Sequence, residues 1–436
     1  MKQDLTAIIN GGQVPQGTVR VSGAKNASTR LLSAALIADE VVKLENFPTE
    51  LVDARYKIEF VKKSGGLIDI DEYNHTISIN PLNYKDVLLK DYNFPIRTTY
   101  LLVPGLIKRS GIARIPYPGG CNIGSRGYDL HIMVWEKLGA KVEEKEDYIE
   151  VRAPKGFQPG EINFPISTIG GTENALISAS TINGETVIKN AYISPEIESL
   201  VAFLRTLGSK IDVVGNSYIK VTGSDSLRGS IFPIMPDRIE ALTWIVYGII
   251  SGGHIKVEDV PFDTMKIPLM HLEHAGIDIY RNKNNVIVSP DCLVNGDIQP
   301  FELACGTHPG IISDMQPFYV MLGLHANGTS RIFDYRYPER LKYCEELSKF
   351  YPLGLQWKPG SITTYGNKKL QGAEANSTDL RGSMALVLAA LLAKGTSKVH
   401  NVEMALRGYN NLKSKLQSLG INIEVESKYK VSIAQL

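Results

Sequence analysis

Stretches that are apolar on all sides alternate along this chain with stretches that are apolar on one side only. The runs at 241–250 (ALTWIVYGII) and 386–393 (LVLAALLA) have no polar face, which predicts buried helices. The runs at 199–208 (SLVAFLRTLG) and 411–420 (NLKSKLQSLG) are amphipathic and predict helices that cover a surface. Short runs rich in β-branched residues, such as 254–260 (HIKVEDV), predict strands.

The same order of elements recurs along the chain. Its copies begin near residues 27, 97, 172, 238, 314 and 381, and successive starts lie 66 to 76 residues apart. This period is too long for a solenoid, whose repeats have about 20–50 residues. Six units of helix, strand, helix and strands instead predict an α/β (α+β) fold with two domains, each built from three βαβαββ repeats. A single α/β sheet with chance internal similarity is the alternative.

The charge balance narrows the possible ligands. The 436 residues include 47 basic and 46 acidic ones, a net charge of +1, so the sequence predicts no nucleic-acid partner. No apolar run of 18 residues predicts membrane insertion, and the start of the chain lacks the apolar core of a signal peptide. The four cysteines form no CxxC pair. We therefore expect a reduced, cytoplasmic protein.

Two segments in the first half carry candidate chemistry. Lys25 and Asn26, in VSGAKNA, stand at the start of a predicted helix, where backbone N–H groups and the helix dipole favour a phosphate. A solvated lysine is the plainer reading. The segment 116–131 (PYPGGCNIGSRGYDLH) holds four glycines, which predict a mobile loop at about 116–127. Cys121 lies in this loop near Arg126, and a cation beside an exposed thiol favours the thiolate.

Cationic and acidic residues recur at the matching places of later units. Asp314 opens a predicted helix, and Arg340, Arg381 and Arg407 open or precede others. Arg97 lies earlier, on a stretch predicted to be buried, where a guanidinium needs a partner. A lone arginine at a helix start is usually structural. Several in a chain of near-zero net charge can instead hold a ligand with several negative charges.

These motifs together resemble the UDP-N-acetylglucosamine 1-carboxyvinyltransferases, a family of enolpyruvyl transferases. They are VSGAKNA (21–27), PGGCNIGSR with DLHI (118–132), STIGGTENA (167–175), PDRIEA (236–241), SDMQ (313–316), TDLRGS (378–383) and RGY (407–409). The resemblance extends over essentially the whole chain. The shikimate-pathway synthase shares the six-unit architecture, but the PGGC loop and the PDRIE stretch are more similar to the sugar-nucleotide branch.

The resemblance implies two inside-out α/β barrels joined by a double crossover. Residues 1–22 would join residues 236–436 in one domain, and residues 23–235 would form the other, with the Cys loop. The implied substrates are phosphoenolpyruvate and UDP-N-acetylglucosamine, with no cofactor and no metal. The family's reaction opens peptidoglycan synthesis, so the resemblance also implies roles in cell wall biogenesis, cell shape, the cell cycle and cell division, and inactivation by fosfomycin.

The resemblance also implies a role for each matching residue. Cys121 would protonate the methylene carbon of phosphoenolpyruvate, and Asp314 would be the base at the acceptor hydroxyl, which Asn26 also holds. The remaining residues would bind substrate: Lys25, Arg126 and Arg407 the phosphate and carboxylate of phosphoenolpyruvate; Arg97, Arg126, Gly127, Tyr128, Asp129, Leu130, Ile166, Ser167, Thr168 and Ile169 the UDP-sugar; Arg336 the acetamido group; Arg340 and Arg381 the rest of the cation set.

The chain departs from the family pattern at a few positions. Ile166 stands where the family often has a basic residue, and Met404, Leu406 and Asn410 replace polar or charged groups close to Arg407. Two alternatives therefore remain open. The chain is a paralogue that transfers enolpyruvyl to a different nucleotide or sugar hydroxyl, or it is a non-catalytic UDP-sugar-binding protein.

Overall fold

The computed structural model describes residues 5–81, 96–117, 119 and 127–427. The chain folds into two compact units, each with its own apolar core. The terminal unit contains residues 5–22 and 236–427, and the inserted unit contains the described residues between 23 and 235. Among the described residues, no helix has the length and apolar character needed to cross a membrane.

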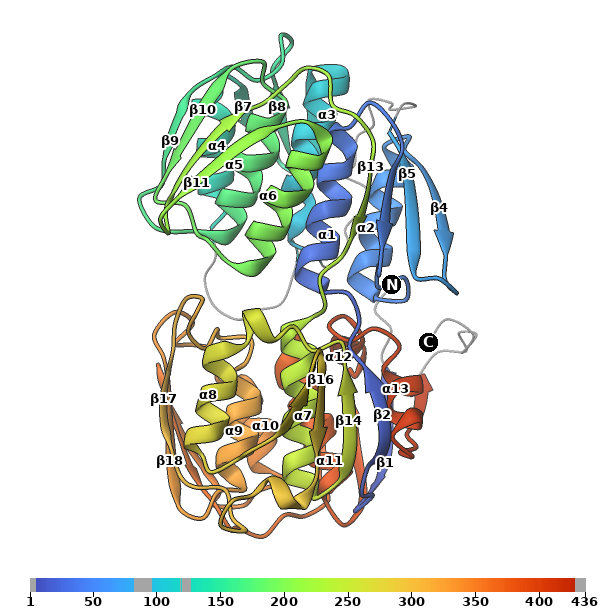
Figure 1. The fold of residues 1–436 in the computed structure, drawn as a ribbon, viewed down its shortest axis with the longest axis vertical. Helices are drawn as coiled ribbons and strands as arrows, with labels where there is room; N and C mark the ends of the chain where they lie inside the picture. The colour runs from blue at the N-terminus through green and yellow to red at the C-terminus, as the bar shows by residue number, and fades with distance from the viewer. Residues whose placement is uncertain (1–4, 82–95, 118, 120–126, 428–436) are drawn as a thin grey trace. The chain divides into compact units, whose positions relative to one another are not determined.

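The inserted unit has three sheets around a group of helices (Figure 1). In sheet order, the strands are β13 (Ser230–Pro233), β3 (Val42–Glu45), β5 (Thr76–Asn80) and β4 (Leu67–Asp71); β6 (Ile112–Pro116), β8 (Tyr148–Arg152) and β7 (Lys141–Glu144); β11 (Lys210–Val214), β12 (Tyr218–Thr222), β10 (Glu185–Lys189) and β9 (Glu161–Asn163). The helices are α1 (Lys25–Ala34), α2 (Val52–Lys63), α3 (Val103–Ser110), α4 (Asp129–Lys137), α5 (Ile169–Ser180) and α6 (Pro195–Leu207).

The terminal unit repeats this plan with three four-stranded sheets. They are β21 (Glu374–Asn376), β22 (Gly395–His400), β1 (Leu5–Gly11) and β23 (Glu424–Ser427); β15 (Tyr280–Asn282), β16 (Asn285–Val288), β14 (His254–Glu258) and β2 (Gln16–Arg20); β17 (Glu302–Cys305), β18 (Thr329–Asp334), β20 (Ser361–Tyr365) and β19 (Leu355–Lys358). The helices are α7 (Arg238–Ser251), α8 (Lys266–His274), α9 (Gln316–Leu324), α10 (Lys342–Ser348), α11 (Leu380–Leu392), α12 (Glu403–Leu406) and α13 (Leu412–Ser418).

Buried helices form the centre of each unit, and they include α7 and α11, which contain the two runs predicted to be apolar on all sides. In the inserted unit α3 contacts both α1 and α5, and in the terminal unit α9 contacts both α7 and α11. From Leu380 to Leu391, α11 is buried at every position, which explains why its sequence has no polar face. The amphipathic helix α6 buries one side only, as its sequence predicts. The sheets lie around these helices, and polar side chains gather at several helix starts, where Asp237 caps α7 and Asp379 caps α11.

The first strand, β1, belongs to a sheet whose other strands come from the end of the sequence. Strand β1 pairs antiparallel with β22, where Thr6 faces His400, and with β23, where Ala7 faces Val425. Strand β2 runs parallel to β14, with Val19 opposite Val257. The terminal unit is therefore built from both ends of the sequence, and the inserted unit interrupts it.

Candidate active site

The terminal unit holds Asp314 between two arginines. Arg340, which precedes α10, donates from Nη1 to Asp314 Oδ1 at 2.9 Å and to the Ser313 carbonyl at 2.9 Å. Its Nη2 lies 2.6 Å from Asp379 Oδ1. Burial alone would lower the pKa of Arg340, but Asp379 and Asp314 outweigh it and raise that pKa above the ordinary arginine value. Asp314 is about a third exposed, so its carboxylate is fixed by Arg340 yet open to a ligand.

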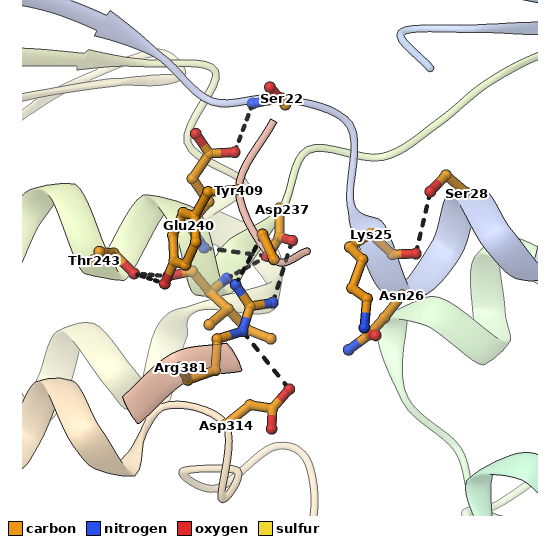
Figure 2. Close-up of polar contacts among 12 residues, drawn as sticks. Ser22, Lys25, Asn26, Ser28, Asp237, Glu240, Thr243, Asp314, Arg381 and Tyr409 are labelled. Carbon is orange, nitrogen blue, oxygen red and sulfur yellow. Dashed lines mark hydrogen bonds and ion pairs between the residues drawn. The ribbon is translucent and has the colours of Figure 1, made fainter. Parts of the chain in front are cut away.

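Arg381 approaches the other oxygen of Asp314 (Figure 2). Its Nε lies 3.9 Å from Asp314 Oδ2, its Nη2 lies 3.6 Å from Asp237 Oδ2, and its guanidinium carbon lies 5.1 Å from the ring centroid of Tyr409. The side chain is 1% exposed, and Nη2 makes no hydrogen bond within the described residues. Arg381 also donates to the Gly408 carbonyl at 3.2 Å, which ties it to the residue after Arg407.

Two aspartates that the sequence analysis did not single out place these arginines. Asp379 and Asp237 are the N-caps of α11 and α7, and each accepts two backbone N–H bonds from the first turn of its helix. Each carboxylate thus holds a helix start and an arginine together. The signal was present in the sequence, because an aspartate directly before an apolar helix is typical of an N-cap.

The other terminal-unit candidates, Arg407 and Arg336, lie on short segments that connect regular elements. Arg407 is the C-cap of α12, is 6% exposed, and places Nη1 3.8 Å from the sulfur of Met404. Met404, one of the residues that depart from the family pattern, therefore contacts Arg407, the predicted phosphate-binding arginine, directly. Arg336 donates its backbone N–H to Asp334 Oδ1 at 3.1 Å, and Asp334 also accepts from Ser313 at 3.0 Å. Asp334 thus connects the loop of Arg336 with the loop that leads to Asp314.

In the inserted unit, Lys25 and Asn26 form the first turn of α1 (Figure 2). Ala24 is the N-cap of α1, and its side chain makes no capping hydrogen bond. Lys25 Nζ lies 3.0 Å from Asp53 Oδ2 on α2. Asn26 contacts Arg30, one turn later on α1, at 3.3 Å. The predicted phosphate lysine is therefore at a helix N-terminus, as its motif indicates.

The structure brings Arg97 together with the start of α4. Arg97 donates from Nη2 to the Gly127 carbonyl at 2.7 Å, and Tyr128, Asp129 and Leu130 follow as the N-cap and first residues of α4. Tyr128 donates its hydroxyl to Glu144 at 2.6 Å, and this hydrogen bond raises the pKa of Tyr128 to about 12. The predicted UDP-sugar residues 97 and 127–130 thus form one group.

The stretch 166–169 leads into α5. Thr168 is the N-cap of this helix and accepts from the Gly171 N–H at 3.3 Å, while Ser167 donates to the Ala191 carbonyl at 3.4 Å. Ile169 is the first residue of α5. Ile166 is 66% exposed, so an apolar side chain occupies a surface position at this helix start. A basic side chain would need no rearrangement to fit there.

Cys121 and Arg126 lie outside the described residues. The described cysteines, Cys292, Cys305 and Cys344, are all buried. Burial raises the pKa of the Cys305 thiol above its usual range and that of Cys344 to about 12. Neither thiol is therefore disposed to act as a reactive thiolate. Within the part of the chain that the structure describes, no group of three or more His, Cys, Asp or Glu side chains is placed to hold a metal.

The chain is similar to known proteins over nearly its whole length. The EPSP synthase (3-phosphoshikimate 1-carboxyvinyltransferase) family profile matches residues 9–416. The UDP-N-acetylglucosamine 1-carboxyvinyltransferase of Trichlorobacter lovleyi is 34% identical over 419 residues, 96% of this chain and 98% of that protein. The protein of the same name from Nitratiruptor sp. is 33% identical over 418 residues, 95% of this chain and 98% of that protein.

Solved structures show the same fold. The enolpyruvyl transferase NikO from Streptomyces tendae has a TM-score of 0.87 at 22% identity, covering 98% of this chain and 100% of that chain. An EPSP synthase from Acinetobacter baumannii has a TM-score of 0.71 at 16% identity, covering 97% and 100%. At these identities the likeness concerns the fold, and it confirms the predicted two-domain α/β class. The family profile and the relatives above 30% identity, both nearly full length, establish that this chain belongs to the EPSP synthase family of transferases.

Proposed function

We propose that this protein transfers the enolpyruvyl group of phosphoenolpyruvate to the 3′-hydroxyl of UDP-N-acetylglucosamine and releases phosphate. The proposal rests mainly on sequence similarity: relatives named for this reaction are 33–34% identical over 95–96% of the chain. Candidate residues within each unit support it: Lys25 lies at a helix N-terminus in the inserted unit, and Asp314 lies between Arg340 and Arg381 in the terminal unit.

The proposed roles are those that the family resemblance implies, and ordinary acid–base chemistry agrees with them. Cys121 gives a proton to C3 of phosphoenolpyruvate, which makes C2 electrophilic. Asp314 takes the proton of the acceptor hydroxyl as that oxygen bonds to C2, forming a tetrahedral ketal. Loss of a proton from C3 and of phosphate from C2 restores the double bond. Lys25, Arg126 and Arg407 carry the charge of the departing phosphate and of the carboxylate.

The remaining predicted residues bind the acceptor. Arg97, with residues 127–130 and 166–169, recognises the uridine diphosphate and sugar, and Arg336 contacts the acetamido group. Arg340 and Arg381 fix Asp314 from both carboxylate oxygens. We place the reaction in the cytoplasm, at the start of peptidoglycan synthesis, and expect fosfomycin to alkylate Cys121. That adduct should appear as a mass shift that a Cys121→Asp protein lacks.

The deciding experiment measures phosphate release from phosphoenolpyruvate with and without UDP-N-acetylglucosamine. Wild type and Cys292→Ala, a matched removal of a buried thiol, should release phosphate only when the sugar nucleotide is present. Cys121→Ala should release at least about a hundredfold less, since general acids contribute about 10²–10⁴-fold. Release that requires a different nucleotide or sugar hydroxyl would refute the proposed acceptor and retain the transfer. If no acceptor supports phosphate release, the proposal that the protein is a catalyst is refuted.

A further inference from the structure

The predicted acceptor residue Asn26 has a partner that no motif indicated. Arg30 follows it by one helical turn on α1 and donates from Nη1 to Asn26 Oδ1 at 3.3 Å and to Thr29 Oγ1 at 3.1 Å. Residues four apart on a helix lie on the same face, so this contact is a direct result of the spacing. Arg30 is 16% exposed and was not among the expected site residues.

The chemistry of arginine fixes the direction of this contact. A guanidinium has five N–H donors and no acceptor, whereas an asparagine amide has one acceptor end and one donor end. The end of Asn26 that faces Arg30 must therefore be the carbonyl oxygen. Its NH₂ group is left on the opposite side, so Asn26 can only donate to a ligand there. Without Arg30, either end of the amide could face the ligand.

Arg30 is in turn held by a buried acid. Its Nε lies 2.9 Å from Glu173 Oε1, and the Glu173 side chain is 3% exposed. Burial raises the pKa of Glu173, although Arg30 opposes that rise, and the nearby charges are Glu196 and Lys57. An ion pair inside a poorly solvated region is stronger and less mobile than one at the surface. Arg30 is thus anchored, because turning away from Asn26 would disturb its ion pair with Glu173.

The anchor also connects two predicted binding segments. Glu173 is on the first turns of α5, which begins directly after Thr168, the N-cap at the end of the predicted UDP-sugar stretch. Asn26 is on the first turn of α1. The contacts Glu173 to Arg30 to Asn26 therefore run from the start of α5 to the start of α1 within the inserted unit.

We propose that Arg30, anchored by Glu173, is a positioning residue that fixes the amide of Asn26 with its NH₂ group toward the acceptor substrate. This inference rests on the proposed function for the identity of the acceptor, but the orientation of the amide does not depend on any substrate. Two measurements, one without ligand and one with turnover, therefore separate the two ideas.

The first measurement is an NMR spectrum of protein with ¹⁵N-labelled asparagine. The side-chain signal of Asn26 is identified by its absence in Asn26→Ala. Arg30→Met should shift or broaden this signal, because the amide loses the contact that fixes it. Arg109→Met is the matched control: Arg109 is 18% exposed, lies 2.8 Å from Asp39 in the same unit, and contacts no predicted site residue within the described part of the chain. It should leave the Asn26 signal in place.

The second measurement compares kcat/KM for UDP-N-acetylglucosamine. Arg30→Met should lower it about tenfold to a hundredfold, the effect of losing one charged hydrogen bond, and Arg109→Met should not. In an Asn26→Ala background the effect of Arg30→Met should vanish, because Arg30 acts through Asn26. If Arg30→Met does not fold, Glu173→Gln releases Arg30 and should move the same signal less.

Three results would overturn the inference. The Asn26 signal could be the same in Arg30→Met and wild type, the two arginine variants could lose equal activity, or Arg30→Met could have its full effect without Asn26. Absent turnover in wild type would count against the proposed function alone, because the NMR result decides the orientation by itself.

Discussion

Replacing Arg340 by methionine tests the assigned ion pairs most directly. The side chain is 3% exposed and bridges Asp314 and Asp379, and Asp379 is itself only 5% exposed. Methionine fills much of the same volume but leaves the buried Asp379 carboxylate without its cation. Removing one partner of a buried ion pair typically costs about 3–5 kcal/mol of unfolding free energy, because the remaining charge stays desolvated. We therefore expect Arg340→Met to destabilise the terminal unit by about that amount.

The control is an ion pair of the same chemistry and length at the surface. Arg331 lies 2.6 Å from Glu302, as Arg340 lies 2.6 Å from Asp379, but its side chain is 57% exposed. Exposed pairs contribute about 0.2–1 kcal/mol, so Arg331→Met should barely change stability. Urea unfolding followed by tryptophan fluorescence measures both variants. A Trp135→Phe background restricts the signal to the terminal unit.

A double substitution sharpens the test. Asp379→Asn keeps an acceptor at the N-cap of α11 but removes the buried negative charge. Arg340→Met combined with Asp379→Asn should therefore cost less than the sum of the two single changes. The reasoning is wrong if Arg340→Met lowers the unfolding free energy no more than Arg331→Met does, with the same slope against urea concentration. It is also wrong if the losses from Arg340→Met and Asp379→Asn simply add in the double variant.

Gly23 and His131, both in the inserted unit, give two further predictions, and Gly306 is the control for Gly23. An added methyl at Gly23 would lie 1.9 Å from the Asn46 carbonyl oxygen, so Gly23→Ala should lower the unfolding free energy by about 1–3 kcal/mol, whereas Gly306→Ala, which meets no atom within 4 Å, should change it by less than about 0.5 kcal/mol. Chemical denaturation measures both, and equal losses would contradict the predicted clash. Burial, with a smaller effect of Arg97, lowers the pKa of His131 to about 3, so between about pH 3 and 6.5 the unfolded chain binds more protons and stability falls as pH falls. Wild type should lose about 2 kcal/mol more than His131→Phe between pH 7 and 5, and parallel pH curves would show that His131 does not titrate in this way.

The sequence predicted what depends on local pattern. The runs at 241–250 and 386–393 have no polar face, and the helices that contain them, α7 and α11, are buried as expected. Surrounding helices and sheets cover these two helices on all sides. The family resemblance is confirmed by nearly full-length relatives. Periodicity and motif order were sufficient here, because each reports on a contiguous stretch of chain.

The sequence could not predict contacts between side chains that lie far apart in the chain. Arg340 meets Asp379 across 39 residues, and Arg30 meets Glu173 across 143. A pattern along the chain does not report which loops face each other once the sheets have formed. The roles proposed for Cys121 and Arg126 stay predictions, because both residues lie outside the described parts of the chain.

The pairing of β1 with β22 has a consequence for synthesis on the ribosome. Thr6 and His400 are 394 residues apart, so at about 5–20 residues per second the first strand waits roughly 20–80 s for its neighbour to be made. The inserted unit is complete in the nascent chain much earlier and can fold while the terminal unit still lacks its second half. During that interval Leu5, Ala7 and Ile9, all buried in the finished protein, have no sheet to enter. Strand β1 is thus translated long before β22 and β23, and its sheet is among the last parts of the protein to form.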